Sequence, residues 1–201
     1  MSLNPYVSAV TGTLFALLVA WQGAIRAQSV PAPNIRTLME QLSDPKAAQP
    51  DTLKRIVEVA RKNPRAREYV VQKLPDMIRA PQSELWLDAI QLAGKLKANE
   101  AIPALQQAMS RPPFPAETYL TFAGLMRLDN DIVAKALSRI GDPAIPAVVD
   151  LLRNGDVGMR YRAVLILRNI GSPTARAALQ DRLPHETDSD IEKLIKDSLH
   201  S

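Results

Sequence analysis

The chain has 201 residues, 46% of them apolar and 23% charged, and it contains no cysteine. This composition excludes disordered and collagen-like chains, a disulfide framework, a thiolate metal site and a cysteine nucleophile. The net charge of +4 is a weak sign of nucleic-acid binding, and 16 prolines against 8 glycines indicate chain reversals fixed by proline at helix starts.

The first segment of the chain is apolar, because residues 1–25 carry no charged side chain. One interpretation is a secretory signal ending at Ile25-Arg26-Ala27, although no Lys or Arg precedes the apolar stretch. Another is a membrane anchor over residues 6–25, with interfacial aromatics about 22 Å apart in a hydrocarbon core of about 30 Å. A third is a buried helix of a soluble protein. For an anchor, the predicted membrane-contacting residues are Tyr6, Leu14, Phe15, Leu18 and Trp21.

Residues 1–27 are thus predicted to be a signal peptide or membrane anchor, and residues 28–33 to be a proline-stiffened linker. Arg26 and Arg36 follow the apolar segment, so a strict positive-inside count would leave the rest of the chain in the cytoplasm. The signal-like end and the linker instead favour an exported domain. We expect a membrane-associated protein with an extracytoplasmic (periplasmic) domain, or an exported soluble protein if residues 1–27 are cleaved.

Residues 34–201 show apolar residues at helical spacing and no Asn-Gly or Asp-Gly hairpin turn. Several helix starts are indicated by a capping side chain directly before a proline. These pairs are Asp44-Pro45, Asn63-Pro64, Asp142-Pro143 and Ser172-Pro173. The pattern predicts an all-α domain of about ten helices over these residues.

An internal repeat organises this helical part. Gly141–Val149 matches Gly171–Leu179 at an offset of 30 residues, and Ala101–Leu105 matches Ala144–Val148 at an offset of 43. A helix-turn-helix unit of about 30 residues cannot bury its own apolar face, whereas stacked neighbours can. The repeat therefore predicts an α-solenoid of stacked antiparallel helix pairs over residues 34–201.

These repeats resemble the HEAT-like family in its short, phycobilisome-lyase form. That pattern is a helix ending in Leu-Gly-x-Ile/Leu, a turn, and Ala-Ile-Pro-x-Leu opening the next helix; Leu92–Leu105 and Leu137–Val148 carry it best. The chain departs from it where Ala93 precedes Gly94 and where Ser138 replaces the glycine. The resemblance covers about residues 84–183 and is weak over 34–80. It implies the fold and says little of function, because members include scaffolds, adaptors and a few enzymes.

The larger offset implies an insertion of about 13 residues near 111–123, which is rich in proline and aromatics. Phe114 lies in a proline-rich bend and is a candidate exposed anchor for a partner, together with Tyr119. Alternatively, Tyr119 and Phe122 pack an extra helix into the core.

Basic residues gather in the last repeats, where arginine is used without lysine over residues 153–182. The alternatives are solvated helix faces with acid–base pairing, a docking surface for an acidic partner or lipid headgroup, and, with less support, a nucleic-acid surface. The predicted partner-binding arginines are Arg153, Arg160, Arg162 and Arg168.

The sequence contains no recognisable catalytic motif. His185-Glu186 is the only His-Glu pair, so the iron site that the resemblance to deoxyhypusine-type hydroxylases would require is not supported. The apolar first segment argues against a cytosolic phycobilin lyase. Trp86 and Asp88 offer only a forced match to HEAT-like DNA glycosylases. We expect no enzyme activity, no cofactor and no metal.

The preferred interpretation is a non-catalytic protein-binding scaffold, membrane-anchored or exported, that serves as an accessory subunit of a larger membrane complex. Its partners would be other proteins and, through residues 6–25, the membrane; nucleic acid is not expected. The alternative is a HEAT-like enzyme or nucleic-acid-binding protein that uses the arginine-rich face.

Overall fold

The computed structural model of the chain describes residues 33–44, 51–80, 85–110 and 131–200, and these ranges contain ten α-helices and no strand. The predicted all-α fold is confirmed for them. The predicted anchor or signal, with most of the linker, lies outside the described residues. The helices are α2 (Pro33–Ser43), α3 (Thr52–Lys62), α4 (Pro64–Arg79), α5 (Leu85–Leu96), α6 (Ile102–Ala108), α7 (Ile132–Ile140), α8 (Ile145–Asn154), α9 (Val157–Ile170), α10 (Pro173–Arg182) and α11 (Ser189–His200).

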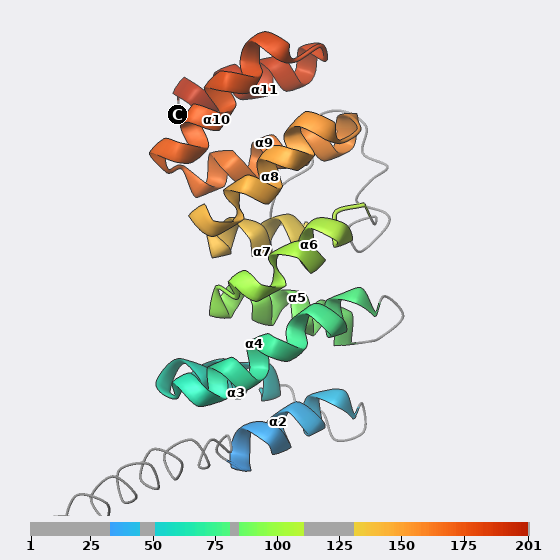
Figure 1. The fold of residues 1–201 in the computed structure, drawn as a ribbon, viewed down its shortest axis with the longest axis vertical. Coiled ribbons are helices and arrows are strands. Elements are labelled where there is room, and N and C mark those ends of the chain that lie inside the picture. The colour runs from blue at the N-terminus through green and yellow to red at the C-terminus, as the bar shows by residue number, and fades with distance from the viewer. Residues whose placement is uncertain (1–32, 45–50, 81–84, 111–130, 201) are drawn as a thin grey trace, which may run out of the picture.

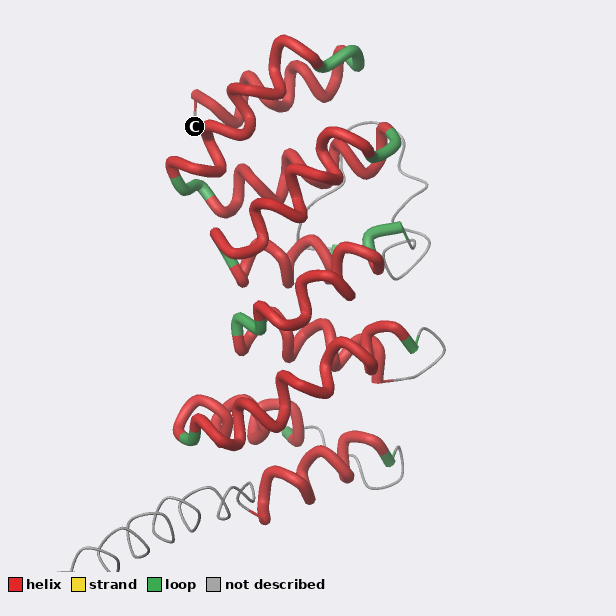
Figure 2. Tube along the Cα trace, viewed as in Figure 1, coloured by secondary structure: helices red, strands yellow, loops and turns green. Residues whose placement is uncertain are grey.

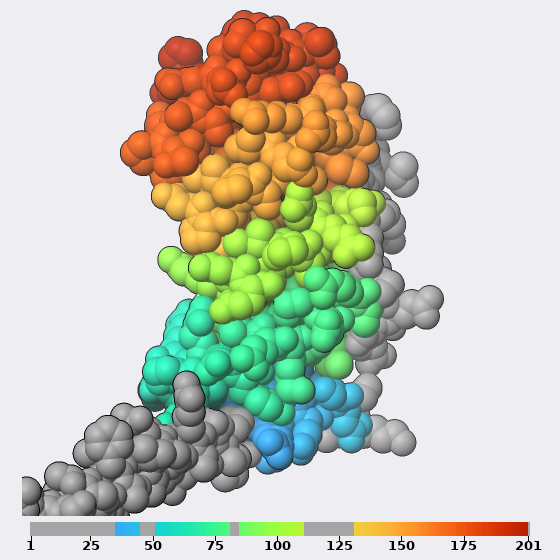
Figure 3. Space-filling view, viewed as in Figure 1, coloured from blue at the N-terminus to red at the C-terminus, as the bar shows by residue number. Residues whose placement is uncertain are grey.

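The helices form two parallel rows that run the length of the molecule (Figure 1). In the odd row, α3, α5, α7, α9 and α11 each pack on the next; in the even row, α4, α6, α8 and α10 do the same. Each helix also packs against the other row, as α4 does on α5 and α8 on α9. Helices α2 and α11 lie at opposite ends of this stack, and Figure 3 shows each layer in contact with the next.

The turns that join an odd-row helix to the following even-row helix all lie on one edge of the stack, the left edge in Figure 2. We call this the turn edge; it holds the C-terminal ends of α3, α5, α7 and α9. In two repeats the turn contains a short 3₁₀ helix, η1 (Asn99–Ala101) before α6 and η4 (Asp142–Ala144) before α8. Successive repeats thus place the C-terminal ends of their odd-row helices next to one another along the turn edge.

Two of the predicted helix starts are confirmed. The side chain of Asn63 accepts hydrogen bonds from the backbone N–H groups of Arg65 (3.0 Å) and Ala66 (3.2 Å), and Ser172 accepts from Ala175 (3.2 Å). Each satisfies donors that the first turn of a helix leaves unpaired.

The predicted cap at Asp142 is wrong, because Asp142 begins η4 and its side chain makes no capping bond. Gly141 has a φ of +87°, which residues other than glycine rarely adopt, and the chain leaves it in a 3₁₀ turn closed by a hydrogen bond from the Ala144 N–H to the Gly141 carbonyl (2.8 Å). Helix α8 therefore begins at Ile145, two residues after the predicted first helical position at Pro143. In the fourth predicted pair, Asp44-Pro45, the proline lies outside the described residues.

The core is a continuous series of thin apolar layers between the two rows. Each layer holds fully buried aliphatic side chains, among them Ile56, Leu74, Ile90, Leu105, Leu137, Leu152 and Ile166. At the ends, α2 and α11 bury one face each and leave polar faces outward, with Lys193, Lys196 and Asp197 exposed on α11.

Candidate protein-binding surfaces

Arg162 does not lie on a surface, so its predicted role in partner binding is corrected. Its side chain is about 5% exposed, and its Nε donates to the carboxylate of Asp131, which is similarly buried. Its Nη1 donates to the backbone carbonyl of Met109. A guanidinium in the interior requires such partners, because burying an unpaired charge costs several kcal/mol.

This buried pair joins the two ends of one long connection. Met109 directly follows α6, and Asp131 directly precedes α7, where its Oδ1 also caps the helix by accepting from the Val133 and Ala134 N–H groups. A single side chain from α9 therefore fixes the points where the chain leaves and rejoins the stack. The predicted partner residues Phe114 and Tyr119 belong to this connection and lie outside the described residues.

Arg160 is held in an ionic cluster where α9, α10 and the start of α11 meet. Its Nη2 lies 3.0 Å from Oε1 of Glu186, and Arg182 contacts the other carboxylate oxygen at 2.9 Å. Burial alone would raise the pKa of Glu186, but hydrogen bonds from Arg160, from the Asp188 N–H, from Arg182 and from the Thr187 N–H outweigh it and lower the pKa to about 2. The Glu186 carboxylate of the His185-Glu186 pair thus has a structural role, as the acceptor that joins Arg160 and Arg182.

The remaining two predicted arginines are exposed. Arg153 on α8 pairs with Asp181 on α10 at 2.9 Å, but both side chains are about 60% exposed, so the pair contributes little stability. Arg168, in the last turn of α9, is exposed and forms no ion pair within the described ranges. Of the four predicted arginines, Arg168 is therefore the one that is exposed and has no ion pair among the described residues.

Two arginines outside the predicted partner-binding set cap odd-row helices at the turn edge. Arg67 Nη2 donates to the carbonyls of Leu96 (3.1 Å) and Lys97 (3.2 Å) at the end of α5, and Arg176 Nη1 donates to the Leu199 carbonyl (3.4 Å) at the end of α11. Each is the fourth residue of its even-row helix. The signal was present as a repeated spacing, in Asn63-Pro64-Arg65-Ala66-Arg67 and Ser172-Pro173-Thr174-Ala175-Arg176.

A hollow of about 280 Å³ lies between α5 and α7. Its apolar lining comes from Ile90, Gly94, Ile132 and Ala136, and its polar lining from Gln91, Lys95, Lys135 and Arg139. No carboxylate lines it. The helices approach closely here, because a Cβ on Gly94 would lie 2.9 Å from Cα of Ala136. This contact explains the glycine of the Leu-Gly motif.

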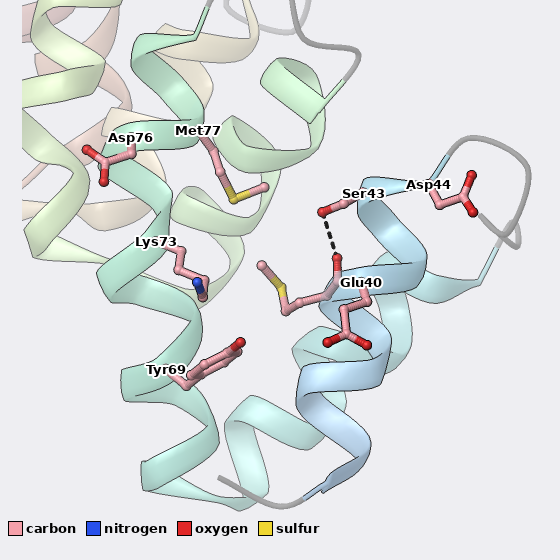
Figure 4. A pocket seen from close by; sticks show the side chains of 8 residues that line it. Glu40, Ser43, Asp44, Tyr69, Lys73, Asp76 and Met77 are labelled. Carbon is pink, nitrogen blue, oxygen red and sulfur yellow. Dashed lines mark hydrogen bonds between the residues drawn. The ribbon is translucent and has the colours of Figure 1, made fainter. Parts of the chain in front are cut away.

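A second cavity, of about 480 Å³, lies between α2 and α4 (Figure 4). Met39, Tyr69 and Met77 provide apolar lining, and Lys73 lies 5.1 Å from the centroid of the Tyr69 ring. Glu40, Asp44 and Asp76 also line it, so its charges are of both signs. This mixture gives no clear preference for a charged ligand.

Three further observations concern metal binding, membranes and nucleic acid. Among the described residues, no three His, Asp or Glu side chains gather in a way that could hold a metal ion. Within the same ranges, no helix has both the length and the apolar character needed to cross a membrane. Trp86 is buried in the core, with 7% of its surface exposed, and so is not available to stack on a base.

Residues 131–199 match the family model for HEAT repeats. This range covers α7 to α11 and includes the ionic cluster at Glu186 and the ion pair of Arg162. A comparison with curated proteins found no match to the chain. The predicted HEAT resemblance is thus confirmed for these repeats, without distinction of the phycobilisome-lyase form. HEAT repeats generally serve as protein-binding scaffolds.

Proposed function

We propose that this chain is a non-catalytic scaffold that binds a partner protein along its stacked helices. The observation that carries the proposal is the HEAT-type stack itself, in which the buried side chains are mostly aliphatic and the buried ionic groups form structural pairs. Such a stack displays an extended surface from equivalent positions of successive repeats, which suits recognition of another protein. The match to HEAT repeats over residues 131–199 supports the same function.

The proposal extends to the location of the scaffold. Residues 1–27 would hold the domain at a membrane, outside the cytoplasm, where it would serve as an accessory subunit of a larger complex; if they are cleaved, the domain would be exported. Support comes from the sequence alone, in the uncharged stretch of residues 1–25 and the proline-containing linker that follows.

Fractionation followed by affinity purification tests both parts. Full-length chain with a C-terminal tag is expected in the membrane fraction after a high-salt wash, and after solubilisation it should retain a partner protein in comparable molar amount. Mass spectrometry of the N-terminus then distinguishes an anchor from a cleaved signal. A salt-soluble chain that still contains residues 1–27 and retains no protein would overturn the proposal.

The insertion is examined by deleting residues 111–118. Because Arg162 fixes Met109 and Asp131 from the stack, we expect the helix content of the deleted chain to match the wild type in circular dichroism. We expect the partner to be lost if Phe114 is an anchor. Undiminished co-purification would count against the insertion as a binding element.

A further inference from the structure

Basic residues in the last turns of the helices differ in whether a carboxylate pairs with them. In the even row each one has a carboxylate partner: Arg79 pairs with Asp76 (3.3 Å), Arg153 with Asp181 (2.9 Å) and Arg182 with Glu186 (2.9 Å). In the odd row, Lys95 of α5, Arg139 of α7 and Arg168 of α9 form no ion pair within the part of the chain that the structure describes. In α3 of the odd row, Lys62 pairs with Glu58 (2.7 Å) and Arg61 donates to the Lys95 carbonyl (3.4 Å). The cations left without such a partner among the described residues are therefore those of three consecutive odd-row helices, α5, α7 and α9.

The fold brings these cations together. The C-terminal ends of α5, α7 and α9 lie on the turn edge in consecutive layers of the stack, so Lys95, Arg139 and Arg168 follow one another along it (Figure 2). Lys97, which directly follows α5 and has a φ of +50°, adds an exposed cation beside the half-buried Lys95. We call Lys95, Lys97, Arg139 and Arg168 the basic edge.

Helix capping does not by itself account for the basic edge. A cation near a helix C-terminus gains about 0.3–1 kcal/mol from the helix dipole, which favours one such residue in any helix. This gain is the same at every helix end, yet Lys62 in the last turn of α3 has a carboxylate partner, and Lys95, Arg139 and Arg168 have none among the described residues. Glu100 and Asp142 are exposed in the neighbouring turns η1 and η4, and neither pairs with a basic-edge residue.

The hollow between α5 and α7 opens beside the basic edge and shares Lys95 and Arg139 with it. Its apolar lining, from Ile90, Ile132 and Ala136, can receive an uncharged side chain, while the cations can contact carboxylates on either side of it. Asp88 lies on the same helix but does not line the hollow, and burial raises the pKa of its carboxyl.

We propose that the basic edge binds an acidic segment of the partner protein, with one apolar side chain of that segment seated in the hollow between α5 and α7. This inference rests on the proposed scaffold function and names the chemistry of its partner. Opposite charges arranged along several repeats provide both attraction and register for an extended segment.

Fluorescence anisotropy with a labelled peptide tests this inference on the full chain. The probe is a peptide of about twelve residues, glutamate throughout except for one central leucine, and its binding should weaken severalfold between about 50 and 200 mM salt. We expect the double reversal Lys95→Glu with Arg139→Glu to weaken binding at least about tenfold.

The matched control reverses two exposed lysines away from the basic edge, Lys54→Glu and Lys193→Glu, and so changes the net charge equally. Equal losses in the two double variants would overturn the inference, since they would show attraction to net charge alone. Equal binding of a peptide with serine in place of leucine would overturn the role of the hollow. Tighter binding of an oligonucleotide of equal charge would overturn the choice of a protein segment.

Co-purification of the partner protein distinguishes failure of the basic edge from failure of the proposed scaffold function. If the partner protein co-purifies with the edge-reversed chain as well as with wild type, the basic edge is overturned while the scaffold function stands. If neither chain retains a partner, the scaffold function itself fails.

Discussion

At the scale of single residues, arginine has several roles that the sequence does not separate. Arg162 is buried and donates to Asp131 and to the Met109 carbonyl. Arg160 forms an ion pair with Glu186, and Arg168 is exposed to solvent. All three lie within one helix, so only their position relative to α7 and η5 (Leu183–His185) decides which is structural. The arginine cluster was visible in the sequence, whereas the carboxylates it meets are 26 and 31 residues away.

Replacing Arg162 by methionine should cost about 3–5 kcal/mol of unfolding free energy, because it leaves the Asp131 carboxylate buried without its cation. Urea unfolding measures this loss. The control Arg168→Met, at an exposed site, should change stability by less than about 0.5 kcal/mol. Equal effects of the two substitutions would contradict the burial of Arg162.

Glu186 should make the free energy of unfolding depend on pH in the acidic range. Its folded-state pKa of about 2 lies below its ordinary value of 4.5, so its ionised form stabilises the fold above that value. The stabilisation should be lost as the pH falls from about 5 toward 2. Glu186→Gln should cost on the order of 2 kcal/mol at pH 7, and the difference from wild type should shrink toward pH 2.

Unfolding at a series of pH values checks this, with Glu192→Gln as the control for a partly exposed ion pair on α11. That control should change stability by less than about 0.5 kcal/mol at neutral pH. If Glu186→Gln lowers the free energy of unfolding by the same amount at every pH, the ionic cluster does not hold the carboxylate ionised.

At the scale of elements, the close contact of α5 with α7 depends on Gly94. Alanine normally favours a helix by about 1 kcal/mol over glycine, but here its Cβ would lie 2.9 Å from Cα of Ala136. Overpacking of this kind costs about 1–3 kcal/mol, which exceeds the helix gain in most of that range, so Gly94→Ala should destabilise the protein by up to about 2 kcal/mol.

Gly158 is the matched control, since it lies in the first turn of α9, where the nearest atom to an added Cβ is an Asp156 oxygen at 3.4 Å. Gly158→Ala should leave stability unchanged or raise it by up to about 1 kcal/mol. Thermal unfolding separates the two, and a stabilised Gly94→Ala chain would contradict the close packing of α5 on α7.

The elements themselves were largely predictable, because their signals are local. Asn63-Pro64 and Ser172-Pro173 mark helix starts correctly, and the repeat at an offset of 30 aligns the ends of α7 and α9. The start of α8 was misplaced because the 3₁₀ turn after Gly141 shares its residue types with a helix cap. The arginine caps at Arg67 and Arg176 were missed because each bond reaches an adjacent helix 23 to 30 residues away.

At the scale of the whole molecule, stacking converts a repeated sequence into a long surface. Contacts run mainly between neighbouring layers, as from α5 to α7 and from α7 to α9, so each repeat is positioned by the ones beside it. A basic residue at the end of one helix is unremarkable in the sequence. Its alignment with equivalents from other layers follows only from the stack, which is why the basic edge was not predicted.

The central claim, a scaffold that holds a partner protein along its basic edge, is tested most directly by site-specific photo-crosslinking in cells. The crosslinking amino acid replaces Gln91, an exposed residue that lines the hollow, and in a parallel chain it replaces Gln72, an exposed residue of α4. We predict one adduct of defined mass from position 91 that is absent at position 72. No adduct at position 91, or the same adduct at both positions, would contradict the claim.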